Sequence, residues 1–100
     1  GRLTLPRFVD VVSTSPARLM GLASKGRLEP GADADIVVID PTDERLIKTR
    51  NLHQKADCTP YEGMVVRGWP RHVWLRGEPI IFGRQLSGYA GQGRFVPRTL

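Results

Sequence analysis

Four consecutive branched apolar residues, Ile36 to Ile39, form the strongest hydrophobic pattern of the chain. Side chains branched at Cβ are stiff and pack well on a pleated surface, so this run favours a strand over a helix. The run lies between Pro30-Gly31 and Asp40-Pro41, and a short apolar run bounded by turn residues is typical of a strand covered on both faces. We therefore expect a central strand over residues 35–40, with its partner strands elsewhere in the chain.

A helical pattern precedes this strand. Its apolar residues are Leu5, Phe8, Val9 and Val12. Their spacing predicts a helix over residues 5–13, with Thr4 as its N-cap and Pro6 in its first turn. A proline disfavours helical backbone in the residue before it, so residues 13–16 predict a break after this helix.

A second short helix is expected directly after the break. Ser15 serves as its N-cap, Pro16 occupies its first position, and Gly21 provides a left-handed C-terminal cap. A serine beside a helix N-terminus could also bind an anion, but capping accounts for Ser15 fully.

Short extended patterns fill the rest of the chain. The strands expected after the central one are residues 45–49, 63–69, 72–76 and 79–82. Polar residues 41–44 predict a turn, residues 50–60 a surface loop, and Gly77-Glu78 a hairpin turn. Alternation places Val73 and Leu75 on one face of their strand, where we expect them to be buried. The chain is thus predicted to be mainly β with two short N-terminal helices.

The C-terminal residues 88–93 contain three glycines, a composition that phosphate-binding loops share. Their order matches neither the dinucleotide fingerprint nor the P-loop, and no helix is expected after them, so we expect a tail that lies against another surface. The helices and strands are too few for a comfortable two-layer domain, which indicates the end of a larger protein. We divide the chain into terminal helices (1–24), a β portion (25–86) and a tail (87–100).

Charge and composition exclude several classes of partner. Fifteen Lys and Arg against ten Asp and Glu give the 100 residues a net charge of +5. The arginines are scattered singly and no nucleic-acid-binding motif occurs, so we expect no nucleic acid partner. No apolar run approaches about 18 residues, and we expect no membrane span. A basic binding module remains the weakest alternative, and steep salt dependence of nucleic-acid affinity would be its sign.

Candidate chemistry is sparse. Cys58 is the only cysteine, which suits a reducing cytoplasm, and no local pattern pairs it as a nucleophile with His53 or His72. Asp33 and Asp35 alternate and could hold a metal, but no further oxygen ligands follow at a calcium-loop spacing, so turn chemistry is the preferred interpretation. No His-x-His or His-Glu-x-x-His occurs. We expect no catalytic, cofactor-binding or metal-binding residue in this chain.

Several motifs together resemble the C-terminal end of the metal-dependent amidohydrolases. The motifs that carry the resemblance span residues 13–22, 25–41, 53–54, 60–64, 68–70, 73–77 and 91–95. The Pro-Gly-Ala-Asp-Ala-Asp stretch with its strand marks the superfamily broadly. The later motifs resemble hydantoinases and dihydropyrimidinases, which open cyclic diamide rings. Three departures, Ser15, Lys55 and Cys58, blur the distinction from allantoinases.

The resemblance implies a fold and a chemistry for a longer parent protein. Residues 1–24 would be the last helices of a TIM-like barrel, and the strands would be part of a small β-sandwich. A barrel requires about 250 residues, more than this chain has. In the family the barrel holds two divalent metals, usually zinc, through histidines, an aspartate and a carboxylated lysine, all upstream of the matched part. This chain alone would therefore be inactive.

The resemblance also implies partners and leaves alternatives open. The partners would be the barrel of the same polypeptide, further copies in a homo-oligomer, and a small cyclic amide substrate, in the cytoplasm. An allantoinase or dihydroorotase-like relative, or a non-catalytic dihydropyrimidinase-like scaffold protein, is the alternative parent. An upstream His-x-His and lysine would favour the enzyme.

Overall fold

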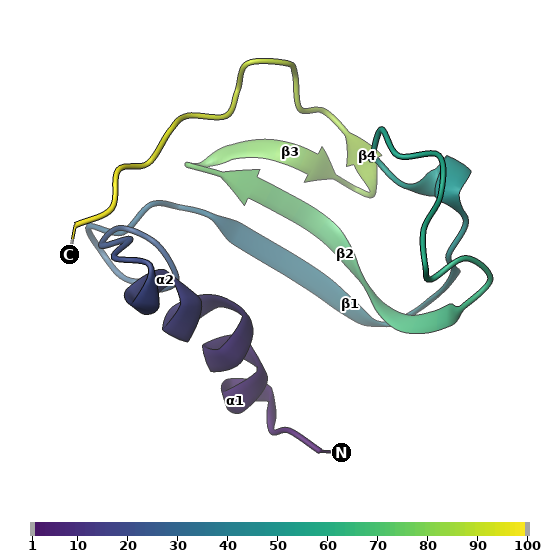
Figure 1. The fold of residues 1–100 in the computed structure, drawn as a ribbon, viewed down its shortest axis with the longest axis horizontal. Coiled ribbons are helices and arrows are strands. Elements are labelled where there is room, and N and C mark those ends of the chain that lie inside the picture. The colour runs from purple at the N-terminus through teal and green to yellow at the C-terminus, as the bar shows by residue number, and fades with distance from the viewer. Residues whose placement is uncertain (1, 100) are drawn as a thin grey trace.

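The computed structural model describes residues 2–99 as one antiparallel sheet beside a short helical segment (Figure 1). The sheet has four strands in the order β1-β2-β3-β4, each antiparallel to its neighbour. The strands are β1 (Ile36–Leu46), β2 (Val65–Leu75), β3 (Glu78–Phe82) and β4 (Gln85–Leu86). The prediction of a mainly antiparallel β chain is confirmed. No helix within residues 2–99 is long and apolar enough to cross a membrane.

The N-terminal segment is one continuous helical run, so the predicted break at residues 13–16 is wrong. It consists of α1 (Leu5–Val9), the π-helical turn η1 (Asp10–Thr14) and α2 (Ser15–Leu19). The Ser15 N–H bonds to the Asp10 carbonyl, five residues back rather than four. This wider turn lets the helix pass Pro16, which has no N–H to donate and whose ring would crowd the carbonyl four residues back.

The helix ends are partly as predicted. The Thr4 hydroxyl accepts a hydrogen bond from the Arg7 N–H at 3.4 Å, which confirms Thr4 as N-cap. Gly21 has φ +69°, and the Leu22 N–H reaches the Ala17 carbonyl at 2.9 Å, as in a Schellman C-cap. The predicted capping role of Ser15 is wrong, because its backbone is already helical.

Strand β1 is longer than predicted. Residues 41–44 form no turn between two strands; they lie within an 11-residue strand as an irregularity. Asp40 pairs with Trp69 and Glu44 with Arg67, so three residues of β1 bulge opposite one residue of β2. The Asp40 carboxylate closes the bulge by accepting from the Thr42 N–H at 3.0 Å and from its hydroxyl at 2.7 Å. Pro41 is tolerated because bulged residues need no ladder bond.

The two strands predicted over residues 63–69 and 72–76 are one strand, β2. Val38 pairs with His72 and Ile39 with Pro70, so Arg71 is an extra, unpaired residue of β2. This bulge next to Pro70 lets the strand continue past the proline. The predicted hairpin follows, but its turn residues are Arg76 and Gly77, one position earlier than expected. Both have positive φ, 50° and 81°, as a tight two-residue hairpin turn requires.

The loop between β1 and β2 covers residues 47–64 and includes the 3-10 turn η2 (Thr49–Asn51). It contains the predicted loop 50–60 but is longer, because the strand predicted over residues 45–49 ends at Leu46 as part of β1. Glu62 ties this turn to the start of β2, because its carboxylate accepts from the Thr49 N–H and hydroxyl, each at 2.7 Å.

The sheet has little cover of its own. Among the described residues only Ala17 and Gln92 are buried. Val37, Val38 and Ile39 are 54%, 42% and 50% exposed, so the predicted two-sided cover of the central strand is not provided by this chain. Val73 and Leu75 are half-buried, and their predicted full burial is wrong for the same reason.

Candidate functional site

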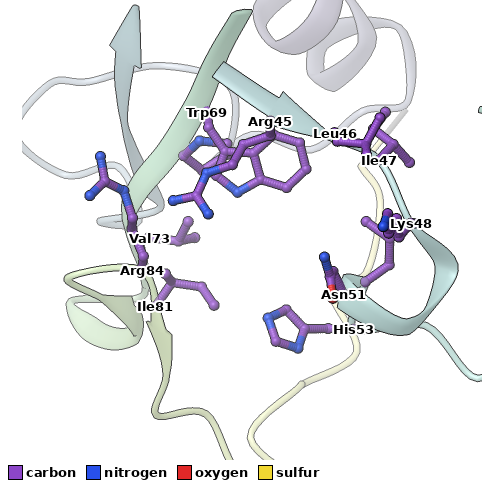
Figure 2. Close-up of a pocket in the computed structure, with 12 residues that line it drawn as sticks. Arg45, Leu46, Ile47, Lys48, Asn51, His53, Trp69, Val73, Ile81 and Arg84 are labelled. Carbon is purple, nitrogen blue, oxygen red and sulfur yellow. The ribbon is translucent and has the colours of Figure 1, made fainter. Parts of the chain in front are cut away.

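An open cavity of about 310 Å³ lies where the end of β1 and the loop after it face the middle of the sheet (Figure 2). Apolar atoms come from Trp69 and Val73 of β2 and from Ile81 of β3. The cationic and titratable side chains at the cavity are Arg45, Lys48, His53 and Arg84. Figure 2 shows these groups arranged around a central opening, with Lys48 and His53 across from Arg84.

Both arginines that line the cavity are held in place by carboxylates. Asp43 contacts the Nε atoms of Arg45 and Arg84 at 3.0 and 3.1 Å. Asp40 contacts Arg84 Nη2 at 3.3 Å. The pKa of Asp40 is lowered chiefly by its hydrogen bonds from Thr42 and further by the charge of Arg84. The bulge in β1 therefore supplies the carboxylates that fix the cavity's guanidinium groups.

A second polar cluster lies at the other end of the sheet. Lys25 Nζ contacts Asp33 Oδ2 at 2.8 Å and Asp35 Oδ2 at 2.5 Å. Asp35 Oδ1 also accepts from the Arg76 N–H at 2.8 Å. We refer to Lys25, Asp33, Asp35 and Arg76 as the Lys25 network. It joins the loop before β1 to the turn between β2 and β3.

The Lys25 network corrects the interpretation of the two aspartates. Their side chains were expected to bond backbone N–H groups close in sequence, but both bond the ammonium of Lys25, and the backbone N–H that Asp35 accepts from is that of Arg76, 41 positions away. The lysine occupies the side of both carboxylates that a metal ion would need. Hydrogen bonds from Lys25 and from the Ser24 hydroxyl lower the pKa of Asp33. Burial works to lower the pKa of Lys25, but its bonds with the two carboxylates outweigh burial and raise that pKa.

The glycine-rich tail packs against this same end of the sheet. Arg76 Nη2 donates to the Gln92 carbonyl at 2.5 Å, and Gln92 Nε2 donates to Glu78 Oε2 at 3.2 Å. Farther on, the Thr99 N–H donates to the Gly21 carbonyl at 2.8 Å. The surface that receives the predicted tail thus includes the β2–β3 turn and the end of the helical segment of its own chain (Figure 1).

The remaining sequence candidates are dispersed. His72 Nδ1 accepts from the Gly83 N–H at 3.0 Å, and its ring lies 4.7 Å from that of Phe82. His53 lines the cavity, whereas Cys58 is exposed in the loop. Within residues 2–99 no three His, Cys, Asp or Glu side chains converge in a way that could hold a metal.

Sequence reasoning missed the cavity's cations. Arg45, Lys48 and Arg84 come from two separate segments, and only the pairing of the strands brings them together. The single usable signal was Arg84, an arginine in a two-residue turn where glycine or asparagine is ordinarily found.

Comparisons with known proteins identify the chain's relatives. A model of the amidohydrolase family matches residues 1–81. A D-hydantoinase of Geobacillus stearothermophilus is 48% identical, and the match covers 99% of this chain and 21% of that protein. A D-phenylhydantoinase of Escherichia coli is 46% identical over 98% of this chain and 22% of its own length.

Solved structures agree. A crystal structure of D-hydantoinase superposes with a TM-score of 0.94 at 43% identity, covering 99% of this chain and 22% of that one. The dihydropyrimidinase from Brevibacillus agri gives 0.93 at 42% identity with the same coverage. The chain thus spans about a fifth of the length of the relatives it matches.

Proposed function

This chain belongs to the amidohydrolase family, and we propose that it is the C-terminal part of an enzyme that hydrolyses the cyclic amide bond of hydantoins or dihydropyrimidines. The observation that carries the proposal is the match of nearly the whole chain, at 43% identity and a TM-score of 0.94, to a D-hydantoinase. The resemblance predicted from the sequence motifs is thereby confirmed. The activity belongs to a longer parent protein, because the matched relatives are about five times as long.

Within that parent, we assign this chain a structural role. Residues 1–24 would pack on a barrel, residues 25–86 would form part of a β-sandwich, and residues 87–100 would bind the surface beside them. The helical segment exposes the apolar side chains that such packing would cover: Leu5 is 75% exposed and Val12 55%. Contiguous exposed apolar surface of this kind marks a contact site.

The family's metal centre does not fit the residues of this chain. The amidohydrolase family suggests two divalent metals, usually zinc, with a carboxylated lysine. Lys25 is the lysine that faces carboxylates, but carboxylation would make it an anion between Asp33 and Asp35. Like charges at that distance repel, so Lys25 is a poor candidate for this modification. We place the metal ligands, and the catalytic residues with them, in the part of the parent that this chain does not include.

The partners follow from the same proposal. They are the barrel of the same polypeptide, further copies of the parent, and a small cyclic amide. Strand β1 lies at the edge of the sheet, and its apolar residues are exposed. These two features support association between copies of the parent, because unpaired strand edges and exposed apolar patches drive protein association. A cytoplasmic location is proposed on the exposed free thiol of Cys58, which suits a reducing compartment.

The test is expression of the complete coding sequence followed by hydrolysis assays with phenylhydantoin and dihydrouracil. We expect ring opening that a chelator abolishes and zinc restores, and no activity from residues 1–100 alone. A full-length protein that is folded but inactive on both substrates, and that lacks an upstream His-x-His and lysine, would instead be a non-catalytic relative.

A further inference from the structure

The cavity of Figure 2 combines an apolar floor with a cationic rim, and none of the described residues that line it is acidic. We propose that this cavity binds a carboxylate carried on an apolar body. The ligand's apolar part would lie on Trp69, Val73 and Ile81, and its carboxylate would lie at the cationic rim, which Arg45 and Arg84 form on one side and Lys48 on the other. This site is separate from the hydrolysis proposed above and does not depend on it.

The size and lining of the cavity suit a small ligand. Its volume of about 310 Å³ lies at the lower end of the range of small-molecule pockets. Such pockets are mainly apolar with a few polar groups, and this one likewise combines apolar side chains with a few cationic ones. Trp69 supplies a broad flat surface, and a ring or branched aliphatic group covers more of it than a bare ion does. A free inorganic anion would use only the rim.

The cationic rim is preorganised for a carboxylate. Asp43 and Asp40 engage Nε of both arginines and Nη2 of Arg84, which fixes the guanidinium planes. Within residues 2–99 Arg45 donates to Asp43 through Nε alone, so its Nη groups make no hydrogen bond to a carboxylate, and the Nζ atom of Lys48 has no acidic partner within ion-pair distance. A guanidinium group held in this way loses little freedom on binding, and its remaining N–H groups match the two oxygens of a carboxylate.

The backbone at Arg84 supports a role for its side chain. Arg84 has φ +68°, and a residue with a Cβ in that region costs about 1–2 kcal/mol relative to glycine. Glycine would serve the two-residue turn between β3 and β4 better if only the turn mattered. Strain of this kind is retained where the side chain is needed in its position.

The carboxylate could come from a free metabolite or from an aspartate of a polypeptide, including the rest of the parent. Both sources present the same chemistry to the cavity, and two probes distinguish them. Phenylacetate represents the free acid, and acetyl-leucyl-aspartyl-leucine amide represents an acidic, apolar peptide. Phenylacetamide, which has the shape of phenylacetate without its charge, is the matched control.

The experiment is a titration of the isotope-labelled 100-residue chain followed by two-dimensional NMR at low salt. We expect the Trp69 indole N–H and the amides of β2 and β3 at the cavity to shift, with a dissociation constant of about 1 mM for the better acid. Phenylacetamide should bind at least about threefold more weakly. Tighter binding of the peptide would indicate a polypeptide source, and tighter binding of phenylacetate a free one.

Two variants, with one control, test whether the cations of the cavity bind the ligand's carboxylate. Lys48→Gln should weaken binding about threefold, whereas Lys55→Gln, the same change outside the cavity, should leave it unchanged. Arg84→Gly relieves the backbone strain, so it preserves the turn while removing the guanidinium, and should also weaken binding. The proposal is overturned if acid and amide bind equally, if neither acid binds, if Lys48→Gln and Lys55→Gln behave alike, or if the chain gives no dispersed spectrum and so forms no cavity.

Discussion

The Lys25 network and the apolar residues of β1 lie in adjoining parts of the molecule but differ in what stabilises them. In the network, an ammonium group, two carboxylates and a backbone N–H satisfy one another within the chain. In β1, Val37 and Ile39 are about half exposed, so the described part of the chain covers them only in part.

This difference separates two kinds of information in the sequence. Polar groups with partners in the chain fix the local shape, since a carboxylate that reaches an N–H leaves little freedom. Apolar residues fix a strand but not its cover, because burial is not directional and any apolar surface can supply it. A chain that spans about a fifth of its relatives can therefore keep their local geometry, at a TM-score of 0.94, with open apolar faces.

The largest effect is expected at Gly26, next to Lys25. Its φ is +75°, and an added Cβ would lie 2.5 Å from Ala17 Cβ and 2.8 Å from the Ser13 carbonyl oxygen. Gly26→Ala should lower the free energy of unfolding by about 3 kcal/mol through backbone strain and overpacking. Gly31→Ala is the control, since Gly31 has φ +92° with nothing within 4 Å, and should cost about 1 kcal/mol. Urea unfolding measures both, and equal losses would contradict the predicted contact.

A smaller effect is expected at Asp35. Asp35→Ala removes the acceptor of the Arg76 N–H and one of the two carboxylates on Lys25. The free energy of unfolding should fall by about 1–3 kcal/mol, the usual cost of an unsatisfied partly buried group. Asp57→Ala, at an exposed loop position, should stay within about 0.5 kcal/mol. The network would not be stabilising if the two variants unfolded at the same urea concentration.

Acid should weaken the network through Asp33. Its folded-state pKa lies below the ordinary value of 3.8, chiefly because of the hydrogen bond from Lys25. Its contribution is therefore complete above the unfolded pKa and is lost as pH falls from about 3.8 through the lowered pKa. Asp33→Asn should make stability less dependent on pH in this acidic range, as thermal unfolding across pH 2–6, roughly spanning that pKa, would show. If Asp33→Asn lost stability at acidic pH in the same way as the unsubstituted chain does, other carboxyl groups would be responsible for that loss.

The smallest effect is expected at the exposed apolar residues. Val37 is 54% exposed, so Val37→Thr should change the stability of this chain by less than about 0.5 kcal/mol. In the full-length parent the same substitution should cost about 1–3 kcal/mol, because there it would bury a hydroxyl. If Val37→Thr lowered the free energy of unfolding of the 100-residue chain by that amount, Val37 would already be buried without the rest of the parent.

How much the sequence could predict depended on the range of the interactions. The strand at Ile36–Ile39, the Thr4 cap and the Gly21 cap rest on neighbours in sequence, and all were found. The break at Pro16 was wrongly predicted because a π-helical turn can pass a proline when the helix has room to widen. The turn at Pro41 was wrong because pairing with β2 holds the bulged residues in the strand.

The candidate site was harder to predict for the same physical reason. Asp35 meets Arg76 across 41 positions, and the cavity needs Arg45 beside Trp69 and Arg84. No spacing rule connects these residues, because the register of three strands decides which side chains meet. Composition showed only that cations were scattered along the chain, not that three of them would gather.

Two contacts of the Lys25 network, Lys25–Asp35 and Asp35–Arg76, also imply an order in which the chain folds. Lys25 and Asp35 are 10 positions apart, whereas Asp35 and Arg76 are 41 apart. Closing the longer loop costs about 1.2 kcal/mol more in chain entropy by the logarithmic rule. The loop before β1 should therefore form first and hold its carboxylates in place, and the hairpin turn then arrives at an acceptor already in position. Folding of this part should be limited by the meeting of β1 and β2 rather than by the loop.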